Sequence, residues 1–323
     1  MNYIGSKLTL TPWIKKVVYE ICGENLQKLI FCDLFAGTGI VGRAFKSEVK
    51  KVISNDFEYY AYVLNRCYIK NAKNTSISLI EKLNNVEPQK GFIYQNYAKE
   101  RMYFSIHNSM KIDAIRVEID KLCDIDKDEF YFLLTSLLES ADKVANTASI
   151  YGAYLKELKK SAQKELILKP AKVEITNQKN EVYNEDANLL IKKIEGDILY
   201  LDPPYNARQY GANYHLLNTI ALYDDFIPKG KTGLREYNKS KYCFKTYVLN
   251  EFEELIKIAN FKYIFLSYNN EGLMSLKQIK EIMSKYGSYN VYRKEYSRFK
   301  ADNNRTHKAD KTYEFLHVLE KNI

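Results

Sequence analysis

Long apolar runs and closely spaced cysteines are both missing from this sequence of 323 residues. No apolar run reaches about 18 residues, the length needed to cross a bilayer, and the N-terminus has no signal-peptide pattern. The five cysteines are scattered without a C-x-x-C pair, which argues against both a zinc site and a disulfide framework. We therefore expect a protein of the reducing cytoplasm, with no bound metal and no membrane association.

Acidic residues are too few to balance the basic ones. Lys and Arg total 49 against 40 Asp and Glu, which gives a formal charge of +9 and a pI near 9.0. Such an excess favours polyanionic partners such as nucleic acid or anionic lipid, although solubility alone also accounts for much of it. Tyrosine is abundant, with 28 residues. Aromatic side chains among lysines suit nucleic-acid surfaces, but an A+T-rich genome produces the same bias.

A glycine-rich segment follows the first apolar run of the chain. Residues 29–35 have the composition of a strand, and Gly37, Gly39 and Gly42 then satisfy G-x-G-x-x-G before a helix. Asp56 follows at the end of a second apolar run, at nearly the distance expected of a carboxylate that binds a ribose. This pattern predicts a nucleotide-type cofactor. A surface aspartate after a strand is the plainer alternative for Asp56.

The same glycine pattern occurs in dehydrogenases, so an NAD-dependent enzyme is the first rival interpretation. Asp33 argues against it, because a carboxylate that enters the loop would repel the pyrophosphate of a dinucleotide. S-adenosylmethionine instead presents an amino group and a sulfonium group. An acidic residue beside the glycines is compatible with those positive groups.

A short proline-containing segment is the strongest functional signal. Asp202-Pro203-Pro204-Tyr205 follows an apolar run, residues 198–201, that is typical of a buried strand. The prolines must end that strand, since each lacks a backbone donor and fixes φ. The segment therefore lies at the carboxyl end of a strand, where open α/β sheets bind their ligands.

The chemistry suggested by this turn is methyl transfer to an exocyclic amino group. The Asp202 carboxylate and the Pro203 carbonyl could both accept hydrogen bonds from one amino group, which would localise a lone pair otherwise delocalised into the ring. Tyr205 would stack on the base, and a base in a duplex must be flipped out to reach such a turn. An ordinary Asp-Pro-Pro turn beside a packed tyrosine remains the alternative for the tetrapeptide alone.

Together these segments resemble the S-adenosylmethionine-dependent amino-methyltransferases with an Asp-Pro-Pro-Tyr motif, especially the N6-adenine DNA methyltransferases of the Dam-like subgroup. The order of motifs is also similar, with an N-terminal Gly5-Ser6-Lys7 segment, the glycine motif, an insertion and then the catalytic turn. The resemblance implies an α/β, doubly wound, Rossmann-like sheet of seven strands with an antiparallel C-terminal hairpin. It also implies restriction-modification methylation of adenine in double-stranded DNA.

Site residues follow from the resemblance. Lys7 would pair with the cofactor's methionine carboxylate, and Asp186 would accept from its adenine amino group, although Asp186 could equally cap a helix. The strand before Asp186 is expected at residues 181–184, with residues 172–176 as a competitor. The resemblance implies cofactor binding by Tyr3, Lys7, Asp33, Phe35, Gly37, Gly39, Asp56, Asp186 and Asp202, and catalysis by Asp202, Pro203, Pro204 and Tyr205.

The domain division rests on a lapse in the alternation of strands and helices. We expect a catalytic domain of residues 1–73 and 178–323, and a mainly helical target-recognition domain of residues 74–177. Isoleucines recur at helical spacing within residues 112–119, and residues 129–145 continue with an apolar face. Residues 156–172, with six lysines and two glutamates, extend this insertion as a basic segment suited to DNA.

Candidate DNA contacts fall in three places. A polar loop after the catalytic turn, residues 206–215, contains Arg208, Gln209 and Tyr210, and a basic hairpin loop near the C-terminus contains Arg298, Lys300 and Arg305. Within the insertion the candidates are Arg101, Asn108, Lys111, Arg116 and residues 146–152. Packing between helices explains the small residues of that stretch, such as Ala148 and Gly152, at least as well.

Other interpretations remain open at this point. An RNA, protein or N4-cytosine amino-methyltransferase would share the cofactor site, and a non-enzymatic nucleic-acid-binding module would share only the basic surface. A cognate restriction endonuclease is a possible partner of the expected enzyme.

Overall fold

A computed structural model describes residues 6–71, 77–122, 126–297 and 311–322. These residues form two compact units, here called the sheet unit (residues 6–57, 176–209 and 238–322) and the helical unit (residues 58–175 and 210–237), each with the gaps just given. Among the described residues, no helix is long and apolar enough to cross a membrane.

The sheet unit contains seven strands in the order β3-β2-β1-β4-β5-β7-β6. The first five in this order run parallel, whereas β7 lies antiparallel between β5 and β6. This arrangement confirms the expected sheet and hairpin. The strands are β1 Ile30–Asp33, β2 Lys51–Asn55, β3 Glu181–Tyr183, β4 Glu195–Leu201, β5 Asn260–Asn269, β6 Gly287–Ser297 and β7 Lys311–Lys321.

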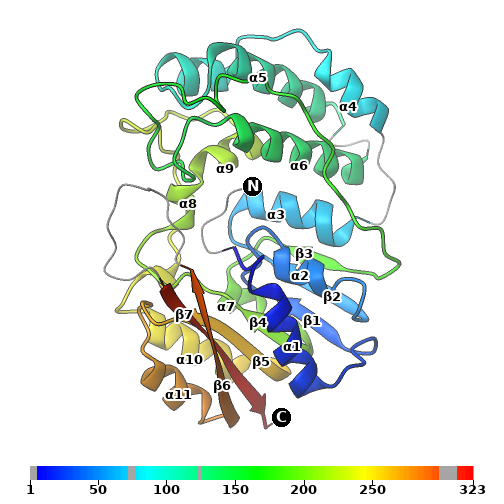
Figure 1. The fold of residues 1–323 in the computed structure, drawn as a ribbon, viewed down its shortest axis with the longest axis vertical. Coiled ribbons are helices and arrows are strands. Elements are labelled where there is room, and N and C mark those ends of the chain that lie inside the picture. Colours follow the sequence, from blue (N-terminus) through cyan, green and yellow to red (C-terminus); the bar gives the residue numbers. More distant parts are fainter. Residues whose placement is uncertain (1–5, 72–76, 123–125, 298–310, 323) are drawn as a thin grey trace. The chain divides into compact units, whose positions relative to one another are not determined.

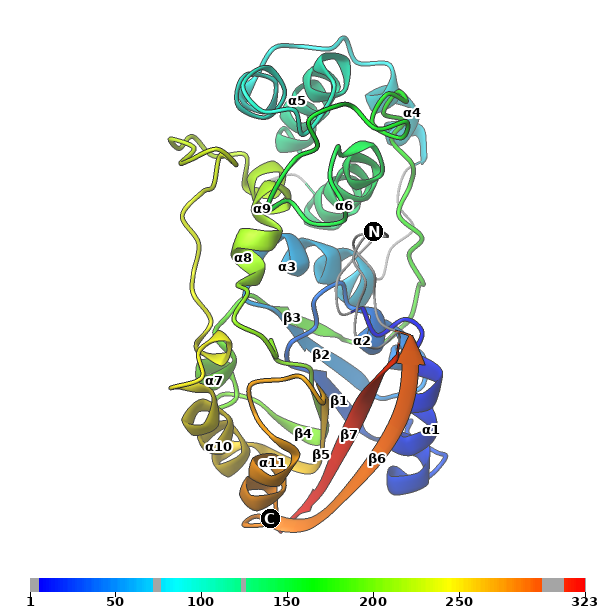
Figure 2. The ribbon, with the colours of Figure 1, turned by 60° about the vertical axis from the view of Figure 1, so that its left-hand side comes forward.

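Helices cover both faces of this sheet because its central strands alternate two apolar sets of side chains. Leu199 and Leu201 of β4 pack with α7, α10 and α11, whereas Tyr200 of β4 stacks near Phe31 of β1 on the other face. Figure 2 shows α1 and α2 on that second side of the sheet. The helices are α1 Thr11–Cys22, α2 Ile40–Phe45, α7 Ala187–Leu190, η3 Lys241–Cys243, α10 Val248–Ile258 and α11 Leu276–Met283.

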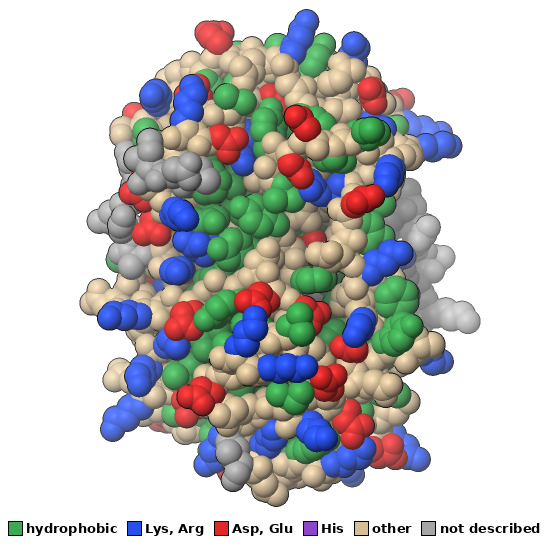
Figure 3. Space-filling view, turned by 180° about the vertical axis from the view of Figure 1, so that it is seen from behind, with side chains coloured by type: hydrophobic (Ala, Val, Ile, Leu, Met, Phe, Trp, Pro, Cys, Tyr) green, Lys and Arg blue, Asp and Glu red, His purple; other side chains and the backbone are tan. Residues whose placement is uncertain are grey.

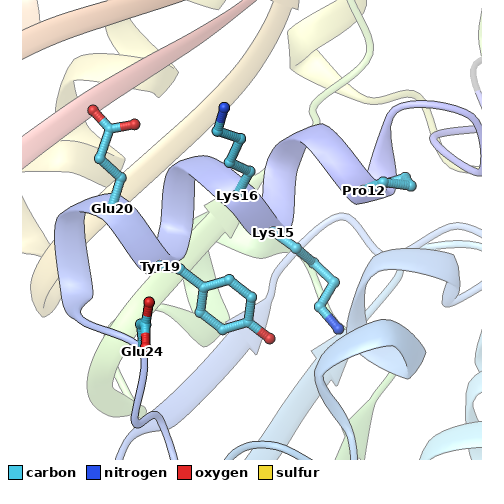
Figure 4. Close-up of a pocket in the computed structure, with 6 residues that line it drawn as sticks. All are labelled: Pro12, Lys15, Lys16, Tyr19, Glu20 and Glu24. Atoms are coloured by element: carbon cyan, nitrogen blue, oxygen red, sulfur yellow. The ribbon is translucent and has the colours of Figure 1, made fainter.

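Helix α1 is fixed by one of its polar edges as well as by its apolar face. The Lys15 ammonium donates to the Ala44 carbonyl at 3.1 Å and to Glu48 at 2.5 Å, and the Tyr19 hydroxyl donates to the same glutamate. A shallow groove along this helix is lined by the six residues labelled in Figure 4. In that view Lys15 and Tyr19 point to one side of the helix, and Lys16 and Glu20 point to the other. The groove is therefore formed by the surface side chains of α1 itself.

The helical unit has its own apolar core, formed mainly by α3, α5, α6 and α9 (Figure 1). The apolar spacing predicted α5 and α6 correctly. The elements of this unit are α3 Tyr59–Asn65, the π-helical turn η1 Arg66–Lys70, α4 Ile77–Asn84, a second π-helical turn η2 Tyr94–Lys99, α5 Ile106–Asp120, α6 Lys127–Val144, α8 Tyr210–Asn213 and α9 His215–Leu222.

Two segments differ from the sequence prediction. Residues 156–172, expected to extend the helical insertion, form no helix, and the polar loop expected through residue 215 is helical from Tyr210 onward. The helical unit is also wider than the insertion expected at residues 74–177. It includes α3 and α9 because their buried faces, with Tyr60 and Leu217, belong to its core.

Candidate active site

Three aspartates lie at the carboxyl edge of the parallel strands. Asp33 ends β1 and aligns with Ser54 of β2 on one side and with Tyr200 of β4 on the other. Asp56 therefore follows β2, and Asp202 follows β4, next to the end of β1. Strands β1 and β4 flank the point where the strand order reverses, which is the usual ligand site of such sheets.

The glycine loop adopts a backbone that other residues rarely adopt. Gly37 and Gly39 have φ values of 53° and 73°, in the left-handed region. The Gly37 N–H donates to Asp56 Oδ2 at 2.7 Å, and the Gly42 N–H donates to Asp33 Oδ2 at 3.0 Å. The two carboxylates that the sequence assigned to a cofactor thus also hold the loop between them.

The Asp33 carboxyl is almost completely buried, with 1% of its surface exposed. Its second oxygen, Oδ1, is buried with no hydrogen-bond partner in the described structure. The pKa of Asp33 is raised to about 7, chiefly by burial and also by the nearby Asp202 and Asp56 carboxylates, against the opposing effects of the Gly42 N–H and the Lys7 ammonium. A cationic or N–H donor placed at this oxygen would satisfy it.

The Asp-Pro-Pro-Tyr turn is paired with the N-terminal segment through Asp202 and Lys7. Lys7 Nζ lies 2.8 Å from Asp202 Oδ1 and 3.3 Å from Glu314 Oε1 of β7, and the Lys7 side chain is only 5% exposed. Burial raises the pKa of Asp202 to about 6, with Lys7 lowering it and Glu314 raising it. We expected the Lys7 ammonium to meet a carboxylate of the cofactor, but here it lies between two carboxylates of the chain.

Tyr205 is held beside this ion pair. Its ring meets the edge of Tyr268 at a centroid distance of 6.3 Å, and Lys7 Nζ lies 5.8 Å from its ring centroid. The Leu273 N–H donates to the Tyr205 carbonyl at 3.0 Å. The Tyr205 side chain is thus fixed by β5 and the residues that follow this strand, and Tyr205 remains partly exposed.

Glu314 and Ser267 are the residues of this cluster that the sequence analysis missed. The Ser267 hydroxyl donates to Glu314 Oε1, and both side chains are buried. A usable signal existed, since Glu314 is the one acidic residue among the mainly apolar residues 313–319 of β7. A glutamate that faces inward from such a strand needs a buried partner.

Two further cofactor candidates have structural partners. Asp186 caps α7, because its carboxylate accepts from the backbone N–H groups of Asn188 at 2.9 Å and Leu189 at 3.1 Å. Phe35 meets the Tyr242 ring edge-on at a centroid distance of 5.1 Å. The strand before Asp186 is β3, as preferred over residues 172–176.

The candidates for DNA contact differ in their exposure and in their contacts within the protein. Arg208 is exposed, whereas the Gln209 amide exchanges two hydrogen bonds with the Ser240 backbone, at 2.8 and 3.2 Å. Tyr210 stacks on Tyr214 within the helical unit, with ring centroids 6.1 Å apart. Tyr3, Arg298, Lys300 and Arg305 lie outside the described residues.

Three of the candidates in the insertion, Asn108, Lys111 and Arg116, are buried. The prediction that they contact DNA is therefore wrong. Arg116 donates to the carbonyls of Ile220 and Ala221 at the end of α9, and Lys111 donates to those of Asn84 and Val86 after α4. Asn108 binds the backbone of residues 162–166. Arg101 is also engaged, with the carbonyls of Asn96 and Gly230. These side chains satisfy carbonyl groups that would otherwise be unpaired.

Comparison with known proteins decides between the rival interpretations. A sequence model of the D12 class N6 adenine-specific DNA methyltransferases matches residues 3–283. The chain belongs to this family. It is an enzyme that methylates the N6 amino group of adenine in DNA, which excludes the dehydrogenase, the binding module and the amino-methyltransferases of other substrates.

Curated type II methyltransferases resemble the chain over most or all of its length. It is 60% identical to the type II methyltransferase M.NlaIII of Neisseria lactamica, over 99% of both chains. It is 39% identical to M.CviAII of Paramecium bursaria Chlorella virus 1, over 93% of both. It is also 39% identical to M.FokI of Planomicrobium okeanokoites, of which it covers 53%.

Proposed function

We propose that the chain takes S-adenosylmethionine as its methyl donor and transfers the methyl group to an adenine flipped out of double-stranded DNA. The observation that carries this proposal is the buried, unpartnered Asp33 Oδ1 beside the glycine loop. The amino group of that cofactor is a donor of the kind that this oxygen lacks. When bound, the cofactor supplies an activated methyl group attached to a sulfonium.

Residues of the carboxyl edge would hold this cofactor. Asp33 receives its amino group, Asp56 a ribose hydroxyl, and the left-handed backbone at Gly37 and Gly39 leaves room along the loop. Phe35 and Asp186 would contact the adenine end, where the Asp186 carboxylate also keeps its helix-capping role.

The chemical role of the turn follows from what N6 methylation requires. The adenine nitrogen would form a bond to the methyl carbon as the bond from that carbon to the sulfonium sulfur breaks, and the nitrogen would give up one proton. Its lone pair must first be withdrawn from the ring. Asp202 accepts from the amino group and is placed to take that proton, and Pro203 supplies a second acceptor. Tyr205 forms the wall on which the flipped base stacks.

The helical unit is proposed to recognise the target sequence. Its basic segment, residues 156–172, has no regular secondary structure and exposes lysines such as Lys156 and Lys160. Together with Arg208 and the basic residues Arg298, Lys300 and Arg305, this segment would contact phosphates. The relatives' type II names favour a restriction-modification system with a cognate endonuclease, acting on DNA in the cytoplasm.

Substitution of the catalytic carboxylate tests the proposed role of the turn. Asp202→Ala should lower the rate of methyl transfer by roughly 10²- to 10³-fold, because an acceptor that localises the lone pair is lost. Affinity for S-adenosylmethionine, measured by titration calorimetry, should remain close to that of the wild type. Tyr205→Ala should keep partial activity.

The matched control is Asp225→Ala, which removes an exposed aspartate from the helical unit. Mass spectrometry of digested DNA identifies the product. An Asp202→Ala enzyme within tenfold of the wild-type rate would overturn the assignment of the turn, and absence of S-adenosylmethionine binding to the wild type would overturn the cofactor proposal.

A further inference from the structure

Glu314 occupies a costly position in the sheet unit. It is 1% exposed, it lies in β7 opposite Asn269 of β5, and its Oε1 atom accepts from the Ser267 hydroxyl. The same oxygen lies 3.3 Å from Lys7 Nζ, whose other carboxylate neighbour is Asp202 at 2.8 Å. One buried ammonium is therefore shared between two carboxylates.

Packing does not account for this arrangement. The neighbours of Glu314 along β7 include the buried apolar residues Leu316 and Val318. An apolar residue at position 314 would therefore pack in this strand without the free-energy cost of burying a charge. Burying two carboxylates around one ammonium also leaves the cluster with a net negative charge. A cost of this kind, located at a catalytic turn, indicates a functional demand.

We propose that Glu314, supported by Ser267, is a positioning residue for methyl transfer: it fixes the Lys7 ammonium against Asp202 and offsets part of its charge, so that Asp202 remains a strong acceptor for the substrate amino group. This inference rests on the proposed role of Asp202. It adds a residue from the antiparallel end of the sheet to the catalytic machinery.

The physical reason lies in the chemistry of lysine. An ammonium on a four-carbon stem is a point charge with three rotatable donors, and a single partner does not define its position. Two carboxylates within ion-pair distance restrict it further. Paired with Lys7 alone, Asp202 would have its charge more fully neutralised, and it would accept less strongly from a substrate N–H.

The ionisable groups around Asp202 determine how its titration should respond. Lys7 and Glu314 act on it directly, Asp33 interacts with it across the edge of the sheet, and Tyr200 and Tyr205 interact with both Asp202 and Lys7. The two tyrosines are neutral at ordinary pH, because burial raises the pKa of each. Removal of the Glu314 charge should therefore lower the pKa of Asp202.

The test is Glu314→Gln, which keeps the shape of the side chain and removes its charge. In single-turnover reactions the methyl-transfer rate should fall roughly 10- to 100-fold, as expected for a misplaced reacting group. The acidic limb of its pH profile should move to lower pH. Affinities for DNA and S-adenosylmethionine should stay close to those of the wild type.

A ligand-free readout separates positioning from folding. The carboxyl ¹³C resonance of Asp202, assigned by its loss in Asp202→Asn, should titrate at lower pH in Glu314→Gln than in the wild type. Glu314→Asp keeps the charge and should restore most of the rate. Glu320→Gln is the matched control, because it removes an exposed glutamate from the same strand.

An unchanged Asp202 titration and pH profile in Glu314→Gln would overturn the inference, as would equal activities of Glu314→Gln and the wild type. Failure of the proposed function looks different. In that case Asp202→Ala stays active, while the Asp202 resonance still responds to Glu314.

Discussion

The buried Asp33 carboxyl links the proposed cofactor site to the stability of the fold. Burial raises its pKa from an ordinary value of 3.8 to about 7, so the folded protein binds this proton more tightly than the unfolded chain does. The stability from this group is complete below pH 3.8 and is lost as the pH rises toward about 7. Asp33→Asn should therefore raise the melting temperature of the ligand-free protein at pH 8, with a gain that shrinks toward pH 4.

Thermal unfolding of Asp33→Asn between pH 4 and 8 checks this sign. The asparagine oxygen can still accept from the Gly42 N–H, so the loop keeps its hydrogen bond. Asp225→Asn, at an exposed position, should run parallel to the wild type. The prediction is wrong if the melting temperature of Asp33→Asn differs from that of the wild type by the same amount at every pH.

Within the helical unit, Asp113 fastens α5 to the segment before it. Its carboxylate accepts from the N–H groups of Gly91, Ile93 and Tyr94 at 2.8 to 3.0 Å, and from the Tyr223 hydroxyl at 2.7 Å. All four partners are donors, and the amide NH₂ of an asparagine would face at least one of them. Asp113→Asn should cost about 2 to 4 kcal/mol of unfolding free energy.

Chemical denaturation followed by circular dichroism measures this cost. The control on the same helix is Glu118→Gln, which alters only a surface ion pair with Lys121 and should change stability by less than about 1 kcal/mol. If both variants unfold at the same denaturant concentration, Asp113 is not the fastening point of α5.

The elements also show where sequence reasoning succeeds. Hydrophobic spacing predicted α5 and α6, and the alternation of apolar runs with glycine and proline turns predicted the parallel strands of the sheet. The same reasoning assigned Asn108 to DNA, whereas its amide holds the backbone of residues 162–166. Backbone partners of this kind depend on tertiary contacts that no local pattern encodes.

The segment of residues 156–172 shows a second limit. We expected this basic segment to extend the mainly helical insertion, but the Leu166 and Leu168 N–H groups donate to the side chains of Asn108 and Asn84. These bonds replace the helical ones, and Pro170 would interrupt a helix in any case. The Glu314 contact was hidden for a related reason, since more than 300 residues separate it from Lys7 in the sequence.

For the whole molecule, the net charge of +9 does not by itself locate the DNA. On the face drawn in Figure 3, Lys and Arg side chains are interspersed with Asp and Glu instead of forming one patch. Salt dependence is a sharper probe. The logarithm of DNA affinity should fall by about 0.9 for each phosphate contact per log unit of salt.

Lys156→Gln and Lys160→Gln, in the exposed basic segment, should each lower this slope by about one without changing the preferred sequence. Lys277→Gln on α11 is the control, because Lys277 is exposed and lies in the sheet unit. Binding measured by fluorescence anisotropy from 50 to 400 mM salt gives the slopes. If the wild type and all three variants show equal salt-dependence slopes, residues 156–172 are not part of the DNA interface.

The order of the strands has a consequence for how the chain folds during its synthesis. The Ile30 N–H of β1 donates to the side chain of Asp197 in β4, 167 residues later, so β1 and β2 emerge from the ribosome long before the centre of their sheet exists. The helical unit ends at residue 237, ahead of β5, β6 and β7. It is therefore the first part of the nascent chain able to close its core, and the seven-stranded sheet is completed only after β7 has been synthesised.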